Sequence, residues 1–439
     1  MVDIAFIREN PGIIKKAAAD KLMPVDIDRL LELDVSLREF TVKTEAIRAE
    51  RNRLSKLIPA CKDNAEKEKL TGQVKTLKTE LSEQEISAEE IRGEFDNLML
   101  RVPSVPAPEV PVGKGEEDNV ELRRVGKVKD FDFTPRDHIE LCEMHNMLDM
   151  PRGAKIAGSR SYFLKNNAVL LEMAVCRFVI DFLTSRGFTP MSVPQLVKEK
   201  AMQGTGYFPI GYEQAYKLPE DELFLIGTSE VSIVSYHQDE ILNLSELPLR
   251  YAGISSCYRR EAGTYGKDTR GLYRVHQFQK VEQVVFCEAD QKKAGDLHYE
   301  ILNNTEMILQ ALELPYRVCL ACTGEIGIGQ IRKHEVETWM PSREAYCETH
   351  SCSTLGDFQS RRSNIRYRDK NGDMRYAFTL NNTGIASPRI LIPLLENHQN
   401  SDGSITVPKA LRPYMNHREL LLHKDWVNSL RGKANSSEG

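Results

Sequence analysis

A long heptad pattern near the N-terminus constrains the fold more than any other feature of the sequence. Spacings of four and three residues alternate through Leu33, Leu37, Phe40, Thr44, Ile47, Arg51, Leu54 and Ile58. After a break at residues 59–64 the pattern resumes at Leu70, Val74, Leu77 and Leu81, and continues less regularly through Ile86, Ile91, Phe95 and Leu98. Side chains at this spacing form one stripe along a helix. We therefore expect an antiparallel hairpin of two long helices over residues 27–100, about 50 Å long at 1.5 Å per residue.

The outer half of this expected hairpin is basic, although the whole chain has a net charge of −5. Residues 40–80 hold ten Lys/Arg against six Asp/Glu, whereas residues 81–100 hold one Arg against six acids. Such a patch suits contact with nucleic-acid phosphates, and it also suits an ordinary solvated coiled-coil surface. The candidate phosphate contacts are Arg48, Arg51, Arg53, Lys56, Lys62, Lys75 and Lys78.

Composition changes after the hairpin and divides the chain into parts. We expect an N-terminal domain over 1–103, a Pro-rich linker over 104–119, a globular domain over 120–425 and a disordered tail over 426–439. The globular part alternates β-rich runs such as LPLRYAGIS and KVEQVVFCE with helical runs at 168–185, 291–312 and 387–397. Strands and helices do not alternate one-to-one, and neither GxGxxG nor GxxxxGK[ST] occurs. An α+β fold on a largely antiparallel sheet is therefore expected.

Composition also limits the cellular setting. No run of 18 apolar residues is present, so no membrane span is expected. The N-terminus resembles neither a secretory signal nor a transit peptide, and the nine Cys are scattered as in a reduced cytoplasmic protein. Cys319 and Cys322 form the one CxxC, with Cys347, His350 and Cys352 as the nearest further ligands. We do not expect zinc there, because structural sites normally show two paired ligand sets.

Several motifs occur together in the globular part. CYRREAG (257–263), a polar loop TYGKDTRG and HQFQKVE (276–282) resemble motif 2 of class II aminoacyl-tRNA synthetases in their seryl-tRNA synthetase form. GFTPMSVPQLV (187–197) resembles motif 1 and TLNNTGIASPRILIPLLEN (379–397) resembles motif 3. GTSE (227–230), ETHSCSTLGDFQSRR (348–362) and ALRPYM (410–415) resemble further stretches, and the hairpin resembles the family's tRNA-binding arm. The resemblance covers residues 1–425 in order.

The resemblance implies a class II catalytic domain that activates an amino acid with ATP. Both reactants are anions, so the reaction mainly needs positioning and cationic stabilisation, for which the planar Arg fork is well suited. Arg259 and Arg389 match the catalytic arginines. The positions that match ATP contacts are Arg259, Glu261, Arg274, Phe278, Glu348, Ser351 and Arg389, of which Glu348 and Ser351 match the Mg²⁺ ligands.

The same resemblance implies L-serine as the amino acid. The positions that match the serine pocket are Thr228, Glu230, Arg259, Glu282, Asn381 and Thr383. A pocket built to bond a hydroxyl rejects alanine, because alanine would leave buried polar groups unpaired. The implied activity is formation of seryl-adenylate and transfer to the 3′ end of tRNA(Ser), which the arm would grip by shape and backbone. The implied assembly, through motif 1, is a homodimer.

Some positions depart from the family's usual wording and keep alternatives open. Arg260 is an extra arginine, Asn382 and Pro388 replace glycines, and Glu325 replaces an aspartate. We expect Arg260 to point away from the substrate, Asn382 to tolerate a positive φ if one is needed, and Pro388 to begin a helix. One alternative is a paralogue that activates another small amino acid or uses a non-tRNA acceptor. Another is a non-catalytic RNA-binding relative, against which the retained Arg259, Glu348 and Arg389 argue.

Overall fold

The computed structural model describes residues 1–263 and 270–422. Within them the chain forms two compact units, one of residues 2–19 and 23–103, the other of Met1, residues 20–22 and residues from 104 onward. Most of the polar loop TYGKDTRG and the whole tail 426–439 lie outside the described residues. The Pro-rich stretch is part of the second unit, where the Ser104 and Ala107 amides donate to the Ile328 and Ile331 carbonyls.

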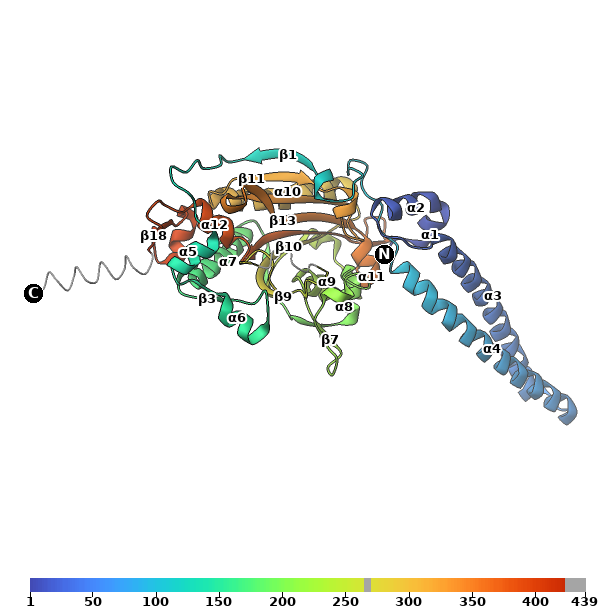
Figure 1. Cartoon of the computed structure of the whole chain (residues 1–439). Coiled ribbons are helices and arrows are strands. Elements are labelled where there is room, and N and C mark those ends of the chain that lie inside the picture. Colours follow the sequence, from blue (N-terminus) through green and yellow to red (C-terminus); the bar gives the residue numbers. More distant parts are fainter. Residues whose placement is uncertain (264–269, 423–439) are drawn as a thin grey trace, which may run out of the picture. The chain divides into compact units, whose positions relative to one another are not determined.

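The first unit is built on a pair of long helices, as the heptads predict (Figure 1). Asp26 and Asp63 cap the N-termini of the long helices with their side chains, which fixes where each helix begins. The ion pairs Arg29–Glu94 and Arg48–Glu85 join the two helices, and the residue number falls along α4 as it rises along α3, so the two helices are antiparallel. The helices of this unit are α1 (Ile4–Glu9), α2 (Pro11–Asp20), α3 (Ile27–Leu57) and α4 (Asn64–Met99).

The seam between α3 and α4 follows the predicted spacing with one exception. Leu37 and Leu54 of α3 and Leu81 of α4 are buried. The prediction for Ile86 is wrong, because its side chain is 62% exposed. Gln84 and Ala88 are half-buried instead, which continues the alternation of three and four residues from Leu81.

The second unit is built on an eight-stranded sheet with the order β1-β11-β12-β13-β16-β10-β9-β4. Its neighbouring strands are antiparallel except for β4, which lies parallel to β9 at one edge. The predicted α+β fold with a largely antiparallel sheet is confirmed. The strands are β1 (Val120–Val125), β4 (Thr189–Ser192), β9 (Leu249–Tyr258), β10 (Gln277–Cys287), β11 (Tyr316–Leu320), β12 (Arg332–Met340), β13 (Ala345–Gly356) and β16 (Phe378–Ser387).

The two faces of this sheet have different side chains because strand residues alternate in direction. On β10, Val281 and Val285 join the core cluster that includes residues of α7 and α10. Val284 and Phe286 point the other way, into a second core cluster with residues of α8 and α9. Figure 1 shows these helices beside the sheet. The helices of this unit are α5 (His138–Met144), α6 (Met150–Ala157), α7 (Asn167–Ser185), α8 (Glu199–Thr205), α9 (Glu230–Tyr236), α10 (Gln291–Ala311), α11 (Phe358–Ser363) and α12 (Leu391–Asn397).

Short strands complete the unit in four small sheets. They are β2 (Leu148–Asp149), β3 (Phe163–Leu164), β5 (Leu196–Lys198), β6 (Lys217–Leu218), β7 (Leu223–Leu225), β8 (Ile241–Leu242), β14 (Arg366–Arg368), β15 (Met374–Tyr376), β17 (Ile405–Thr406) and β18 (Leu420–Leu421).

The cysteines give no sign of a metal site in the described part of the chain. Cys319 lies on β11 and Cys322 follows it, both buried, and all nine cysteines are free thiols. The described residues contain no group of three His, Cys, Asp or Glu side chains that could hold a metal ion. A search of the same residues finds no helix that is long and apolar enough to cross a membrane.

Two buried histidines lie between α10 and the sheet. His298 on α10 bonds Thr354 Oγ1 at 2.8 Å through Nδ1 and His334 Nδ1 on β12 at 2.7 Å through Nε2. Burial lowers the pKa of His334 to about 4 and lowers that of His298 well below its usual value, and the charge of Arg332 acts in the same direction. Both rings are therefore neutral in the folded protein at neutral pH.

This pair predicts an acid-sensitive stability. Above the ordinary His pKa of about 6.5 both states are neutral, but below it the unfolded chain takes up protons that the folded chain cannot, so stability falls as pH drops from 6.5 toward 4. Urea unfolding followed by the fluorescence of Trp339 on β12 measures this slope. His298→Gln with His334→Gln is expected to flatten it, whereas His417→Gln, at an exposed position, is expected to leave it unchanged. An equal slope in both variants would contradict this account.

Candidate active site

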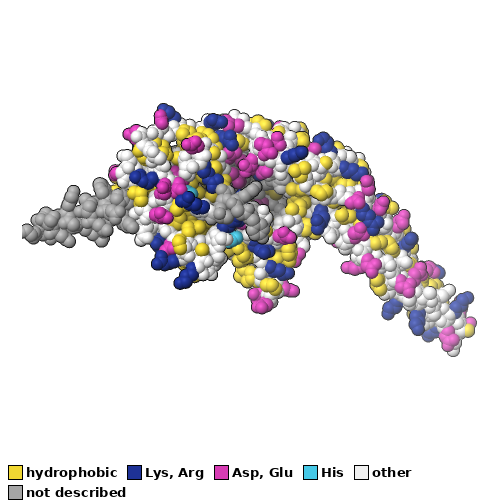
Figure 2. All heavy atoms as spheres, in the orientation of Figure 1, with side chains coloured by type: hydrophobic (Ala, Val, Ile, Leu, Met, Phe, Trp, Pro, Cys, Tyr) yellow, Lys and Arg dark blue, Asp and Glu magenta, His cyan; other side chains and the backbone are white. Residues whose placement is uncertain are grey.

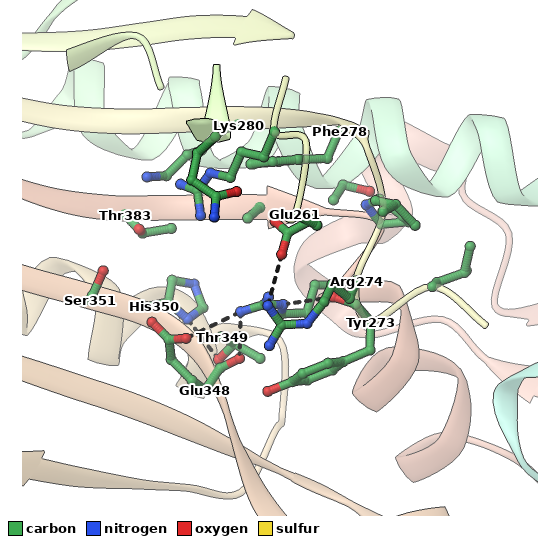
Figure 3. A pocket seen from close by; sticks show the side chains of 18 of the residues that line it. Glu261, Tyr273, Arg274, Phe278, Lys280, Glu348, Thr349, His350, Ser351 and Thr383 are labelled. Atoms are coloured by element: carbon green, nitrogen blue, oxygen red, sulfur yellow. Dashed lines mark hydrogen bonds and ion pairs between the residues drawn. The ribbon is translucent and has the colours of Figure 1, made fainter. Parts of the chain in front are cut away.

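A cavity of about 350 Å³ opens on the face of the sheet opposite α7 and α10 (Figure 3). Its lining brings together residues from the end of β9, from β10, from β13 and from the end of β16. Eight of the residues predicted from the sequence line it, namely Arg259, Glu261, Arg274, Phe278, Glu348, Ser351, Thr383 and Arg389. Residues more than 100 positions apart in the chain thus share one cavity.

The β10 strand supplies one row of side chains. Phe278, Lys280 and Glu282 alternate along the strand and face the cavity side, since β10 pairs with β9 in an unbroken register. The Arg259 guanidinium lies 5.2 Å from the centre of the Phe278 ring and contacts the Gly227 carbonyl oxygen at 3.4 Å. This stacking holds a planar cation and an aromatic face at the same end of the cavity.

Glu261 and Arg274 reach the cavity from segments that are not strands. Residues two apart on a strand face the same side, so the sequence predicts Arg259 and Glu261 on one face of a common strand. That prediction is wrong, because β9 ends at Tyr258 and Glu261 has a φ of 53°. Arg274 likewise precedes β10. The Arg274 guanidinium nonetheless contacts Glu261 Oε2 at 2.8 Å (Figure 3). This ion pair joins the two segments on either side of the loop that connects β9 to β10.

A β-bulge on β13 places Glu348 and Ser351 on the cavity side. Glu337 of β12 pairs with Glu348 and Val336 pairs with His350, so Thr349 is the extra residue. Without the bulge, residues three apart on a strand would face opposite sides. Burial alone would raise the pKa of Glu348, but the cations Arg389, Lys333, Arg259 and Lys280 together hold the pKa below its usual value. Glu348 is therefore an ionised carboxylate in a cavity rich in positive charge.

Arg389 is held by three groups that fix its position. Its guanidinium donates to the Tyr273 carbonyl at 3.2 Å and to Glu348 Oε2 at 3.3 Å, and it lies 4.5 Å from the centre of the Tyr273 ring. Pro388 lines the cavity beside it. The prediction that Pro388 begins a helix is wrong, because β16 runs to Ser387 and α12 begins at Leu391.

Glu282 and Thr383 are direct cross-strand partners on β10 and β16. Side chains in this relation have Cβ atoms about 5 Å apart. The pKa of Glu282 is raised to about 7, mainly by burial, with the Glu230 charge acting in the same direction and the Lys280 ammonium, which forms an ion pair with Glu282, opposing both. Glu282 and Thr383 therefore offer a buried carboxylate and a hydroxyl side by side.

The remaining serine candidates lie next to this pair and do not line the main cavity. Glu230 begins α9 and its Oε1 accepts a bond of 2.6 Å from Asn381 Nδ2 on β16. Asn381 faces the same side of β16 as Thr383, two residues on. Thr228 is buried just before α9. Glu230 and Asn381 are thus bonded to each other on the side of β16 that Thr383 also faces.

The departures from the family's wording fall outside the pocket, apart from Pro388. Asn382 lies in extended β16 without a positive φ, and its side chain faces α10, where Nδ2 donates to the Ile301 carbonyl and to Thr305 Oγ1. Arg260 is exposed and donates to the Glu213 carbonyl, as expected for a side chain that points away. Glu325 is absent from the cavity lining.

Lys280 and Tyr273 were missed by the sequence analysis although both line the cavity. The alternation Phe278, Lys280, Glu282 was a sufficient signal for Lys280, because all three face one side of a strand. The sequence holds no such signal for Tyr273, because it lies before β10. Its ring contacts Arg343 and Arg389, which are distant in the sequence and meet it only in the folded chain.

Comparisons with known proteins match this architecture. Residues 214–398 match the tRNA synthetase class II core domain (G, H, P, S and T), and residues 1–106 match the seryl-tRNA synthetase N-terminal domain. The fold and the cavity are therefore those of a class II aminoacyl-tRNA synthetase.

Relatives that match over nearly the whole chain identify the family within this class. A serine–tRNA ligase of Deinococcus radiodurans is 50% identical over 96% of this chain and 99% of the relative, and one of Dictyoglomus turgidum is 42% identical over 96% and 99%. The crystal structure of seryl-tRNA synthetase from Pyrococcus horikoshii complexed with ATP has a TM-score of 0.87 and 35% identity, covering 96% of this chain and 100% of that one. The chain belongs to the seryl-tRNA synthetase family.

The bonds behind the pocket predict a stability effect at Thr305. Its hydroxyl donates to the Thr383 carbonyl at 2.9 Å and accepts from Asn382 Nδ2 at 2.9 Å. Thr305→Val leaves both buried groups short of a partner and is expected to cost about 1–3 kcal/mol, lowering the urea midpoint. Thr305→Ser keeps the hydroxyl and should stay close to the wild type. The idea fails if the Val variant is as stable as the Ser variant.

Proposed function

We propose that this cavity joins the carboxylate of L-serine to the α-phosphate of ATP, releases pyrophosphate and then presents the seryl group to the 3′ end of tRNA(Ser). The family to which the chain belongs makes it an aminoacyl-tRNA synthetase, a serine–tRNA ligase. The observation that carries the assignment of roles is the shared cavity of Arg259, Arg389 and Phe278, with Glu282 and Thr383 paired beside it.

The nucleotide would lie along Phe278 and the arginines. The Phe278 ring offers a face for adenine, and Glu261 lies within reach of the same nucleotide. Arg259, directly after β9, would hold the α-phosphate and the serine carboxylate together, and Arg389 and Arg274 would bind the outer phosphates. Because these cations are fixed by protein contacts before the substrates bind, they stabilise the negative charge of the transition state without reorganising.

Glu348 and Ser351 fit a magnesium ion. Mg²⁺ prefers oxygen ligands and binds through one or two carboxylates together with substrate phosphates and waters. The bulge on β13 brings an ionised carboxylate and a hydroxyl to the same cavity wall. When bound there, the ion would neutralise phosphate charge, and Arg389, which contacts Glu348, would keep the carboxylate oriented toward it.

The serine end of the site is polar and buried. Glu282 and Glu230 would receive the ammonium and the hydroxyl, with Thr383, Thr228 and Asn381 supplying further bonds. Alanine would leave these groups unpaired. Since Asn382 faces α10, the motif 3 change does not alter this pocket, and no observation favours the alternative of a different amino acid or acceptor.

The helical hairpin is proposed to bind the tRNA body. Lys56, Lys62, Lys75 and Lys78 are exposed and, in the described part of the chain, form no ion pair, whereas Arg48 and Arg53 pair with Glu85 and Glu50. Arg51 is half-buried beside Asn52. Positive and negative side chains are interspersed on the side of the hairpin that Figure 2 shows. The four lysines are therefore the strongest candidates for phosphate contact.

The surface proposed for the homodimer lies on α6, β3 and α7. Ile156 and Phe163 are 71% and 43% exposed, and Leu170 and Met173 on α7 are 41% and 64% exposed. β4, which belongs to the motif 1 segment, is the last strand at one edge of the eight-stranded sheet. Exposed apolar side chains next to an unpaired sheet edge mark an interaction surface. The expected place of action remains the cytoplasm.

Amino-acid-dependent ATP–pyrophosphate exchange tests the function. Serine is expected to support exchange, while alanine, which lacks the hydroxyl, and threonine, which adds a methyl group, are expected to support little. Cysteine is the demanding competitor, because it is close to serine in size. Exchange with another amino acid and none with serine would overturn the proposal.

Arg259→Ala is the loss-of-function variant for the pyrophosphate exchange assay. Exchange is expected to fall by about a hundredfold or more, as for removal of a preorganised transition-state donor. Arg260→Ala, one residue further and exposed, is the control and should keep nearly wild-type exchange.

Neutralising the hairpin lysines tests the tRNA arm. Combined Lys→Gln changes at Lys56, Lys62, Lys75 and Lys78 are expected to raise the KM for tRNA in serylation and to weaken its salt dependence, because phosphate contacts release counterions. Pyrophosphate exchange should be unchanged. The four Lys→Arg changes keep the charge and serve as the control. Unimpaired charging by the Gln variant would show that these lysines do not bind tRNA.

A further inference from the structure

A buried amide on α11, which does not line the cavity, holds the Glu230 carboxylate. Gln359 Nε2 donates to Glu230 Oε1 at 2.7 Å, and Gln359 Oε1 accepts from Thr379 Oγ1 at 2.7 Å. Gln359 is 1% exposed and Thr379 is 0% exposed. The three side chains therefore form a relay from β16 through α11 to the first turn of α9, away from solvent.

The direction of this relay is set by chemistry. An amide can present either its oxygen or its NH₂ group to a neighbour. The Thr379 hydroxyl has one proton, and it donates this proton to Gln359 Oε1. At the other end of the amide, the Thr205 carbonyl can only accept, and it lies 3.3 Å from Gln359 Nε2, which also donates to Glu230 Oε1. These two acceptors keep the NH₂ group turned toward Glu230, and the Thr379 hydroxyl holds the amide oxygen on the opposite side.

The consequence for Glu230 is a carboxylate held in one orientation. Oε1 accepts two N–H donors, from Gln359 and from Asn381. Among the described residues Oε2 accepts no hydrogen bond, so this oxygen is the one that can receive an N–H or O–H of the amino acid. Without the relay, the carboxylate could rotate away from the substrate.

We infer that Gln359 and Thr379 are positioning residues that set the affinity for serine by holding Glu230 with one oxygen directed at the substrate. This inference rests on the proposed function. Neither residue lines the cavity that would hold ATP, so the relay acts on the amino acid and leaves the nucleotide alone.

The isosteric change Gln359→Glu tests the relay directly. It keeps the shape of the side chain but puts a carboxyl oxygen where the amide donated. Two ionised carboxylates at hydrogen-bond distance repel each other, so at pH 8 the bond to Glu230 is lost unless the pair takes up a proton. In pyrophosphate exchange the KM for serine is expected to rise about tenfold or more, as for a lost hydrogen bond to a charged group, while the KM for ATP stays within about twofold.

The pH profile separates positioning from a general structural effect. A protonated Glu at position 359 can donate to Glu230 as the amide does. The ratio of the serine KM of Gln359→Glu to that of the wild type should therefore shrink as pH falls from 8 to 6. A loosened fold would raise the KM for serine and ATP together with no such trend, and that outcome would overturn the inference.

Two further variants keep the test decisive. Thr379→Val removes the donor that holds the amide oxygen and should raise the serine KM several-fold, whereas Thr379→Ser keeps the hydroxyl and should not. Gln291→Glu adds the same charge at the exposed start of α10 and should change nothing. If the wild type shows serine-dependent exchange but Gln359→Glu has an unchanged KM for serine, the inference is overturned and the proposed function stands. Absence of serine exchange in the wild type overturns the proposed function, and the inference with it.

Discussion

The pairing of β10 with β9 and β16 is the constraint on which the site depends. β10 lies between its two neighbours, and one side of it is packed against α7 and α10 through Val281 and Val285. This packing fixes which residues face outward, because a shift of one position would turn every side chain to the other face. Phe278, Lys280 and Glu282 are thereby directed to the cavity side. The apolar residues packed against the helices thus determine the orientation of the side chains that form the site.

Charge balance is the second requirement, since buried charges need partners. Three acids of the site form an ion pair with a basic side chain. Glu261 pairs with Arg274, Glu348 with Arg389, and Glu282 with Lys280. Glu230 is held instead by the neutral amides of Gln359 and Asn381, which leaves its charge available to an ammonium. A set of fixed cations at one end and a carboxylate with neutral partners at the other suits the binding of a zwitterion beside a polyphosphate.

The elements with strong periodicity could be predicted from the sequence. The hairpin and the β-rich runs followed from spacing, and eight residues of the cavity followed from the family resemblance, whereas Lys280 and Tyr273 did not. The misses have identifiable causes. Ile86 is apolar but lies off the three–four alternation that Gln84 and Ala88 continue. The bulge at Thr349 and the end of β9 at Tyr258 depend on pairing between distant strands, which no local pattern reveals. The relay through Gln359 arises only when α9, α11 and β16 meet.

The most direct measurement of this account is a crystal structure with Mg²⁺ and a non-hydrolysable analogue of seryl-adenylate. The account predicts the adenine ring on Phe278, the acyl-phosphate link at Arg259, the amino group within hydrogen-bond distance of Glu230 or Glu282, and the serine hydroxyl at Thr383 or Glu282. Binding of the analogue outside this cavity would contradict it. So would a reversed orientation, with the amino group at Glu348 and the adenine ring among Glu230, Glu282 and Thr383.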